Sequence, residues 1–318
     1  MYSRIISTGS YLPEKRLTNF DFEQMLETSN SWIVERSGIE SRRVAGDNEL
    51  ASDLGYKAAY SALKRANLEP NDVDLIIVAT TTPDMIFPST ACIVQSKLGV
   101  KDCIAFDVQA VCSGFVYGLN IADLFIKSGQ AKTALVIGSE VYSRILDYND
   151  RGTCVLFGDG AGAAIIANSK KAGLMAAKLH ANGDYKDKLC VPGSISKGKV
   201  SGNPFVHMDG PAVFKFAVKA FEEVSLEVMH KANIKISEID WFIPHQANTR
   251  IMKSTAQKLG LDEKKLVSTV HHHGNTSAAS IPLALNEFVE DGKIKSGDTV
   301  LLAGVGGGFT WGGILLKY

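Results

Sequence analysis

The 318-residue sequence has no long apolar run and no excess of charge of either sign. No segment approaches the roughly 18 consecutive apolar residues of a membrane-spanning helix, and residues 1–16 lack the continuous apolar stretch of a signal peptide. Lysine and arginine number 34, as do aspartate and glutamate, so the formal net charge is +0. That balance excludes the broad electropositive surface of nonspecific nucleic-acid or membrane binding. We therefore expect a cytoplasmic protein with neither of these partners.

Cysteine is scarce, and its spacing lacks the patterns of metal and redox sites. The five cysteines are odd in number and widely spaced, and no two of them form a C-x-x-C pair. Each is therefore either an inert core residue or a reactive thiol, and we expect no metal site. The cysteines are Cys92, Cys103, Cys112, Cys154 and Cys190.

The composition is that of a soluble globular protein, with 45% apolar and 21% charged residues. A chain of this length can bury a large core. Strand-like apolar runs recur between amphipathic stretches, and this alternation predicts an α/β fold with several buried strands. The predicted strands are residues 73–80, 103–108, 133–139, 161–167, 239–244, 265–270, 299–304 and 311–318.

Two segments share one order of landmarks, which indicates an internal duplication. Residues 66–99 and 232–260 each begin with an Ala-Asn pair, continue through an aspartate that precedes a strand, and end in Lys-Leu-Gly. A Ser-Gly pair precedes a predicted strand at 128–129 and again at 296–297. We interpret the chain as two related halves, residues 1–170 and 171–318, with the chemistry between them.

Three polar residues stand at predicted strand-to-helix turns, where the ligands of α/β folds gather. Cys112 comes before an apolar-periodic helix, whose N-terminus favours the thiolate form of a cysteine. His245 and Asn275 follow two strands of the second half. Taken singly, each has an ordinary alternative as a buried cysteine, a structural histidine or an N-cap asparagine. Together they fit acyl-transfer chemistry with a cysteine nucleophile.

Two other motifs invite functions that their context does not support. Three histidines, residues 271–273, suggest a metal, but adjacent side chains of an extended segment point in opposite directions and zinc-type spacing is absent. The glycines at 304–308 follow a strand like a dinucleotide-binding loop, but a strand-like segment comes next instead of a helix. These glycines instead allow backbone N–H groups to approach a ligand or an oxyanion closely.

Four ordered motifs are specific when taken together. They are VCSGF around Cys112, PHQANTR around His245, GNTSAAS around Asn275 and the C-terminal GGGFTWGG. With these motifs the sequence resembles the β-ketoacyl-acyl carrier protein synthase III family of the thiolase superfamily, over essentially the whole chain. The resemblance implies a thiolase-like α/β fold of duplicated αβαβα halves, with the nucleophile in residues 1–170 and the histidine and asparagine in 171–318.

The resemblance also implies an acyltransferase that initiates fatty-acid biosynthesis. The enzyme would condense a short acyl-CoA, acetyl-CoA foremost, with malonyl-acyl carrier protein through an acyl-Cys112 intermediate, with no cofactor beyond the CoA thioester substrate. His245 and Asn275 would stabilise the enolate oxygen formed by decarboxylation. The N–H groups of Cys112 and Gly306 would hold the oxyanion at the acyl-cysteine. The implied partners are acyl carrier protein, acyl-CoA and a second copy of the chain in a homodimer.

A CoA entrance of aromatic and guanidinium groups is part of the same expectation. Phe87 is expected to reach into the acyl pocket of the partner subunit and to limit acyl length. Two positions depart from the family pattern: Ser37 stands where threonine is usual, and Asp209 stands where some relatives carry asparagine near the pantetheine. The expected CoA and substrate residues are Trp32, Arg36, Arg151, Gly152, Phe157, Asp209, Phe214, Ala247 and Asn248.

The carrier surface is expected to be acidic, so a neutral chain needs a local basic patch to attract it. Lys215 and Lys219 are spaced i,i+4, and Arg250 and Lys253 are spaced i,i+3, so each pair lies on one helix face. The second pair follows the expected catalytic histidine. We predict that these four residues and Gln246 dock the carrier.

Two alternative functions use the same residues. A quinolone- or polyketide-type ketosynthase would apply the same cysteine, histidine and asparagine to a different acceptor. A Cys-His hydrolase or an acyl-binding protein would perform no condensation. Hydrolysis requires water at the acyl-cysteine and a general base, whereas Asn275 beside His245 favours enolate stabilisation and the apolar motif surroundings disfavour water.

Overall fold

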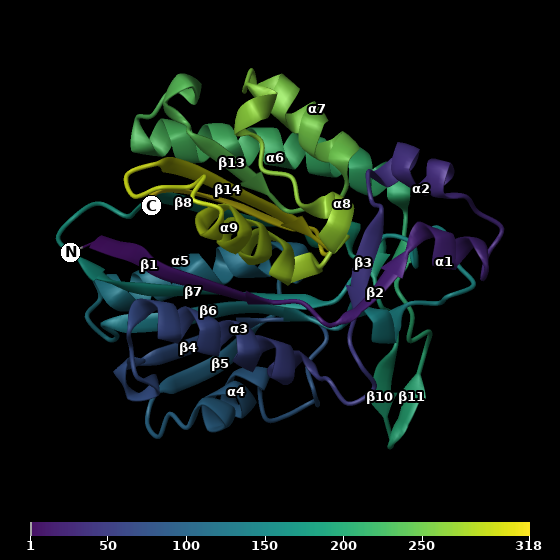
Figure 1. Cartoon of the computed structure of the whole chain (residues 1–318), viewed down its shortest axis with the longest axis horizontal. Coiled ribbons are helices and arrows are strands. Elements are labelled where there is room, and N and C mark those ends of the chain that lie inside the picture. Colours follow the sequence, from purple (N-terminus) through teal and green to yellow (C-terminus); the bar gives the residue numbers. More distant parts are fainter. Residues whose placement is uncertain (1) are drawn as a thin grey trace.

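The computed structural model describes residues 2–318, in which two β-sheets alternate with three layers of helices (Figure 1). The first sheet has the strand order β1-β7-β6-β4-β5. Strand β4 runs parallel to β5 and β6, whereas β7 is antiparallel to both of its neighbours. Its strands are β1 (Tyr2–Tyr11), β4 (Leu75–Ala79), β5 (Ile104–Val108), β6 (Thr133–Glu140) and β7 (Gly160–Ser169).

The second sheet has the order β13-β14-β15-β8, with β13 and β14 parallel and the other pairs antiparallel. Its four strands repeat the order of four strands of the first sheet, because β8, β15, β14 and β13 are arranged like β1, β7, β6 and β4. The boundary expected at residue 170 falls between β7 and β8. The strands are β8 (Leu174–Ala181), β13 (Trp241–Pro244), β14 (Thr299–Gly306) and β15 (Thr310–Lys317).

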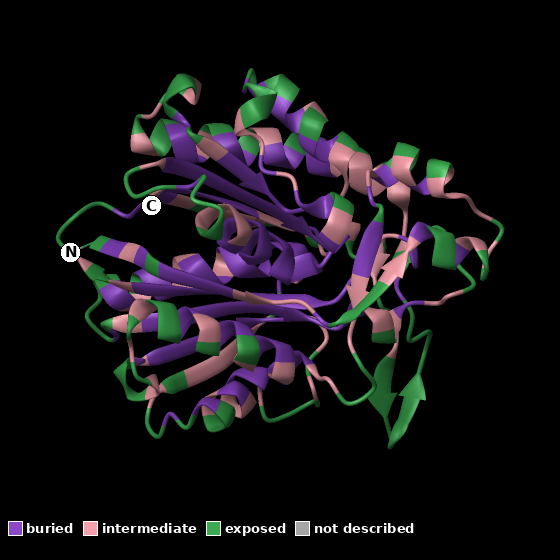
Figure 2. Cartoon of the chain, viewed as in Figure 1, coloured by how far each residue is buried: buried purple, intermediate pink, exposed green. Residues whose placement is uncertain are grey.

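Helices α5 and α9 lie between the sheets, α3 and α4 cover the first sheet, and α6 and α7 cover the second (Figure 1). Buried residues concentrate in the sheets and in the two central helices (Figure 2). The layer order is therefore αβαβα, and the predicted α/β class is confirmed. The helices are α3 (Ala51–Ala66), α4 (Thr90–Leu98), α5 (Gly114–Lys127), α6 (Gly210–Ala232), α7 (Thr249–Leu259) and α9 (Ser280–Glu290).

The strand predicted at 265–270 is wrong. This segment forms a single bridge, between Phe242 and Leu266, and then turns into the short helix α8 (Val270–His273). The side chain of Gln246 occupies the backbone groups that a ladder would use. Its Nε2 donates to the carbonyl of Val267 (3.2 Å), and its Oε1 accepts from the N–H of Thr269 (2.8 Å).

Two residues beside the central helices have left-handed backbone. Val111, in the 3₁₀ helix η2 (Val111–Ser113), has φ 49°, and Ser277, in η7 (Ser277–Ala279), has φ 48°. Such conformations cost free energy in residues other than glycine and cluster at functional sites. These two turns contact each other and lie at the ends of α5 and α9 that meet between the sheets.

No helix within residues 2–318 is long and apolar enough to cross a membrane. Smaller elements complete the fold. They are β2 (Lys15–Thr18), α1 (Asn19–Glu23), α2 (Asn30–Ser37), β3 (Ser41–Val44), β9 (Leu189–Cys190), β10 (Ser194–Ser196), β11 (Lys199–Ser201), β12 (His207–Met208), and the 3₁₀ helices η1 (Pro70–Asp72), η3 (Tyr142–Ile145), η4 (Gly183–Tyr185), η5 (Ile236–Glu238) and η6 (Glu263–Lys265).

Candidate active site

One cavity of about 590 Å³ brings Cys112, His245, Asn275 and Gly306 together. The nucleophile candidate comes from η2 in the first half, and the other three residues come from the second half. The cavity thus lies between the two halves. Cys112 and His245 follow predicted strands, whereas Asn275 follows the short helix α8, because the strand predicted before it does not form. Most of the remaining lining is apolar, from α6 and from the segment around Phe157.

Cys112 is almost fully buried, with 2% of its surface exposed. Its Sγ donates to the Ser277 hydroxyl at 3.5 Å. The thiolate expected at a helix N-terminus is not favoured here: burial raises the pKa of the Cys112 thiol to about 12, and the hydrogen bond to Ser277 offsets only part of that rise. A proton therefore has to leave Cys112 during any reaction in which it is the nucleophile.

His245 follows β13 and is held through its backbone and one ring nitrogen. Its N–H donates to the carbonyl of Ala303 (2.7 Å), and its Nδ1 lies 2.7 Å from Oγ of Ser280. The N–H of Gln246 donates to that same oxygen (3.3 Å), and the Ser280 hydroxyl has no acceptor other than Nδ1 among residues 2–318. Its proton therefore points to Nδ1, which leaves the ring proton on Nε2. Burial lowers the pKa of His245 to about 3, so the imidazole is a neutral donor.

Asn275 presents a donor to the same cavity. Its Oδ1 accepts the N–H of Ser277 (2.9 Å), which fixes the orientation of the amide. Its Nδ2 has no acceptor among residues 2–318, so both protons of this nitrogen are available to a ligand. Asn275 does not cap α9, and the ordinary N-cap alternative is therefore wrong, since the helix begins at Ser280 without a side-chain cap.

Gly306 ends β14 and packs against the backbone of η2, the turn that carries Cys112 and is called the nucleophile turn below. A Cβ atom at this position would lie 2.7 Å from the N atom of Cys112 and 2.8 Å from the carbonyl oxygen of Ala110. Only glycine allows this approach of the two backbones. The close backbone approach that the glycine run predicts therefore occurs beside Cys112.

The cavity opens at a mouth that carries three exposed arginines. The guanidinium carbons of Arg36 and Arg151 lie 4.6 Å and 5.1 Å from the ring centroid of Trp32, and Arg250 lies 5.6 Å from that of Phe214. Every residue of the expected CoA site except Asp209 lines this cavity.

Two departures from the family pattern have structural roles here. Asp209 caps α6 by accepting from the N–H of Ala212 (3.2 Å) and pairs with Lys188 (2.9 Å). Both partners of the Asp209 carboxylate, like Asp209 itself, lie outside the lining of the cavity. Ser37 turns its hydroxyl to the carbonyl of Ile33 (2.6 Å), so it offers no donor to the cavity.

The predicted docking residues do not form one free basic face. Gln246 is fully buried, because its amide binds backbone groups of the second half, and its assignment to a docking surface is wrong. Lys219 pairs with Glu223 (3.5 Å) and Lys253 with Glu263 (3.4 Å), pairs that reduce their net positive field. Lys215 and Arg250 are exposed without an ion-pair partner among residues 2–318.

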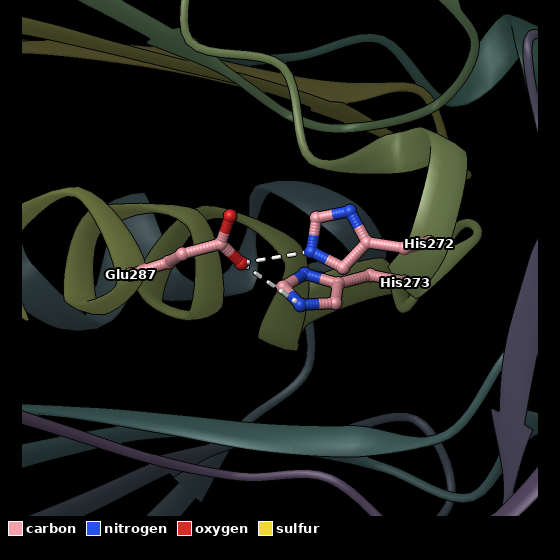
Figure 3. A group of neighbouring side chains, drawn as sticks. All are labelled: His272, His273 and Glu287. Atoms are coloured by element: carbon pink, nitrogen blue, oxygen red, sulfur yellow. Dashed lines mark hydrogen bonds and ion pairs between the residues drawn. The ribbon is translucent and has the colours of Figure 1, made fainter. Parts of the chain in front are cut away.

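The three histidines lie in a helical turn, and the reason for excluding a metal there is wrong. Nε2 of His272 and of His273 lie 2.9 Å and 3.2 Å from one carboxylate oxygen of Glu287 (Figure 3). The three ligand atoms lie within 4.8 Å of one another. Nδ1 of His273 is buried with no partner in residues 2–318, whereas ligating imidazoles normally have a partner on the second nitrogen. We therefore interpret the cluster as hydrogen bonding that ties α8 to α9.

Three polar residues around the site were not predicted. Ser277 contacts the thiol, Ser280 orients the imidazole, and Glu140 accepts from Ser277 (3.0 Å) while fully buried at the end of β6. The two serines belong to the motif GNTSAAS, so their proximity to Asn275 was a usable signal. No sequence signal pointed to Glu140, because it lies in the first half of the chain and only the fold brings it next to Ser277.

Comparisons with known proteins agree with this arrangement. Residues 106–183 match the family model described as 3-oxoacyl-[acyl-carrier-protein] synthase III, and residues 229–318 match the model of its C-terminal part. The crystal structure of such a synthase from Aquifex aeolicus VF5 is 47% identical, over 99% of this chain and 100% of that one, with a TM-score of 0.95. The Pseudomonas aeruginosa PAO1 synthase is 38% identical, over 100% and 98%, with the same TM-score.

A third similar structure is the priming β-ketosynthase of the R1128 polyketide pathway. It is 32% identical, over 99% of this chain and 96% of that one, with a TM-score of 0.94. The agreement in fold across these structures confirms the expected thiolase-like architecture.

Proposed function

The chain belongs to the 3-oxoacyl-[acyl-carrier-protein] synthase III family, whose members are condensing acyltransferases of fatty-acid biosynthesis, and we propose that it condenses a short acyl-CoA with malonyl-acyl carrier protein. The observation that carries the proposal is the convergence of Cys112, His245 and Asn275 on one largely apolar cavity. We further propose that acetyl-CoA is the acyl donor and that no cofactor takes part. The cytoplasmic location expected from the sequence stays a prediction.

In the first step, the sulfur of Cys112 attacks the acyl carbonyl of the CoA thioester. The carbonyl oxygen gains negative charge, and backbone N–H groups of Cys112 and Gly306 stabilise it. The close packing of Gly306 against the nitrogen of Cys112 supports this pairing. CoA leaves as its thiolate, and the acyl group remains on Cys112.

In the second step, the malonyl thioester loses CO₂, and charge develops on the thioester oxygen. Nε2–H of His245 and Nδ2–H of Asn275 donate to that oxygen, since both are neutral donors without a protein acceptor. Removing one such donor typically costs about 3–4 kcal/mol of transition-state stabilisation. The carbanion then attacks the acyl-cysteine carbonyl, and the new carbon–carbon bond displaces the Cys112 thiolate.

The same site disfavours hydrolysis. A hydrolase needs a base that activates water, but burial keeps the pKa of His245 near 3, which makes the imidazole a weak base. The lining around Cys112 is mostly apolar and holds a water poorly. The polyketide-type alternative shares all three residues, so it differs only in the acceptor.

We propose that a second copy of the chain completes the acyl pocket. The loop before α4 exposes apolar side chains that a monomer leaves in water, with Phe87 82% and Ile86 74% exposed. A cavity of about 140 Å³ lined by Thr81, Val111 and Tyr142 adjoins the nucleophile turn and offers a place for such a ring. The homodimer expected from the sequence therefore supplies Phe87 in trans.

Incubation with acetyl-CoA and malonyl-acyl carrier protein tests the proposal. The wild type should give a ketoacyl-carrier and a Cys112 acetyl adduct on intact-mass analysis. Cys112→Ala should give neither, whereas Cys154→Ala, which removes another buried free thiol, should give both. Release of acetate without a condensed product would establish the hydrolase, and full acylation of Cys112→Ala would place the nucleophile elsewhere.

A further inference from the structure

Glu140 is a fully buried carboxyl group in contact with the site through a hydroxyl. Oγ of Ser277 donates to Oε1 of Glu140 at 3.0 Å and accepts from Sγ of Cys112 at 3.5 Å. The donors thus point in one direction, from thiol to hydroxyl to carboxylate. A proton can move along this chain by two coordinated transfers without any side chain leaving its place.

The other neighbours of Glu140 keep it ready to accept a proton. The hydroxyls of Thr81 and Thr82 donate to its oxygens at 3.0 Å and 2.6 Å, and the N–H of Thr81 donates at 3.1 Å. Oγ1 of Thr82 also accepts from the N–H of Val141 (2.8 Å), which leaves its own proton free for the carboxylate. The N–H of Thr81 can only donate, and the hydroxyls can donate to a carboxylate, so this environment suits the charged form of Glu140.

No cation balances this charge. Glu140 takes part in none of the ion pairs formed within residues 2–318. Burial raises the pKa of Glu140 above its ordinary value, although the threonine and serine hydroxyls offset part of the rise. A buried carboxylate without a cation costs free energy, and groups that carry such a cost cluster at functional sites.

We propose that Ser277 and Glu140 form a proton relay that takes the thiol proton of Cys112 when the acyl group is loaded and returns it after condensation. This inference rests on the proposed function. As the sulfur attacks the thioester, its proton passes to Oγ of Ser277, and the serine proton passes to Glu140. The leaving CoA thiolate takes its proton from solvent, and Glu140 stays protonated beside the acyl-cysteine.

Condensation closes the cycle. The carbanion displaces the Cys112 thiolate, and the proton stored on Glu140 returns through Ser277 to the sulfur. No net charge enters the buried site during acylation, because one negative charge only moves from carboxylate to sulfur. The neutral form of Glu140 also removes a negative charge from the neighbourhood in which the carbanion forms, which lowers the barrier to decarboxylation.

Alkylation of Cys112 by iodoacetamide between pH 7 and pH 9 tests the relay, with peptide mass spectrometry isolating this cysteine. If the relay operates, one proton exchanges between Cys112 and Glu140, and the share of reactive thiolate does not depend on the pH of the solution. The wild-type alkylation rate should therefore vary less than about threefold over this range. In Glu140→Gln no carboxylate can hold the proton, so solvent must remove it and the alkylation rate should rise about tenfold per pH unit.

The acyl reaction gives a second measurement. Acylation of Ser277→Ala by acetyl-CoA should fall at least about tenfold at pH 7 and should recover at pH 9, since hydroxide replaces the relay. Ser113→Ala is the matched control, because it removes a buried hydroxyl beside Cys112 that bonds Ala110 and Thr310 instead of Glu140. Its pH profile should remain flat.

The other titratable groups facing the relay do not titrate in this range. Burial raises the pKa of the Tyr142 phenol, and burial lowers the pKa of His245 to about 3. The relay is overturned if the alkylation rate of Glu140→Gln is as independent of pH as that of the wild type. It is also overturned if Ser277→Ala is acylated at the wild-type rate at pH 7, or if the wild-type alkylation rate itself rises tenfold per pH unit. Alkylation needs no acyl-CoA, so a wild type that is flat but forms no ketoacyl product overturns the proposed function and leaves the relay standing.

Discussion

Replacing Gly306 with alanine should slow acyl loading severely while leaving the fold intact. The φ angle of Gly306 lies outside the left-handed region, so an alanine meets no backbone strain of its own. The added Cβ, however, would lie 2.7 Å from the nitrogen of Cys112 and 2.8 Å from the carbonyl oxygen of Ala110. Both atoms belong to backbone and cannot rotate away, so β14 and the nucleophile turn must separate.

The size of the effect follows from that separation. The contact of Cβ with a backbone atom normally exceeds about 3.4 Å, and relief of the two contacts moves the turn by a fraction of an ångström. A misplacement of this order at a reacting centre costs about 100-fold, and loss of one oxyanion donor costs about 10²–10³ in kcat. We therefore expect acylation of Cys112 to fall about 100-fold or more.

Single-turnover acylation by acetyl-CoA, followed by intact-mass analysis, measures this rate directly. Gly183→Ala is the matched control, because no atom lies within 4 Å of a Cβ at that position, and its rate should equal the wild-type rate. Thermal melting of both variants checks that the fold is retained. A Gly306→Ala protein that melts like the wild type and acylates at the wild-type rate would remove Gly306 from the oxyanion site.

Four further outcomes are expected. His245→Ala and Asn275→Ala should each lower malonyl decarboxylation about 100-fold or more while retaining partial transfer to Cys112, as carrier decarboxylation assays can show. Because burial lowers the pKa of His245 to about 3, the wild-type decarboxylation rate should show no inflection near pH 6.5 in a pH profile. Phe87→Ala should raise kcat/KM for six-carbon relative to two-carbon acyl-CoA, since about 0.8 kcal/mol is available per buried methylene. Lys215→Glu should raise KM for the malonyl-carrier alone in a salt-dependent way, whereas Arg250→Glu, at the cavity mouth, should impair acyl-CoA as well.

Much of the fold was predictable because its signals are local. Continuous apolar runs at residues 73–80, 133–139 and 299–304 became buried strands, since both faces of each sheet are covered by helices. The run at 265–270 also contains the β-branched residues typical of strands but forms no strand. There the deciding factor was Gln246, a side chain about 20 residues away that takes the backbone groups of the would-be ladder. The residues of the segment itself give no sign that Gln246 will bind its backbone groups.

The candidate site was also predictable where its signals are local and unpredictable where its properties depend on the fold. Cys112 and His245 were predictable because each follows a strand in a short motif. Asn275 was predictable from its motif alone, since the strand expected before it is replaced by the short helix α8. The protonation of these groups was not, since it depends on burial: a helix N-terminus favours a thiolate, yet enclosure of Cys112 raises its pKa. Gln246 illustrates the complementary error, because a polar residue next to His245 looked exposed and is instead fully buried.

The charges around the cavity are arranged as decarboxylation requires. Its charged lining consists of Arg36, Arg151 and Arg250, all exposed at the mouth, whereas the deep end offers the neutral donors of His245 and Asn275. A cation beside the malonyl carboxylate would stabilise the ground state, in which that charge is localised, and so would raise the barrier. Neutral donors aimed at the thioester oxygen stabilise the charge only after it has moved there. Keeping cations at the mouth therefore separates binding of an anionic substrate from the chemistry at its far end.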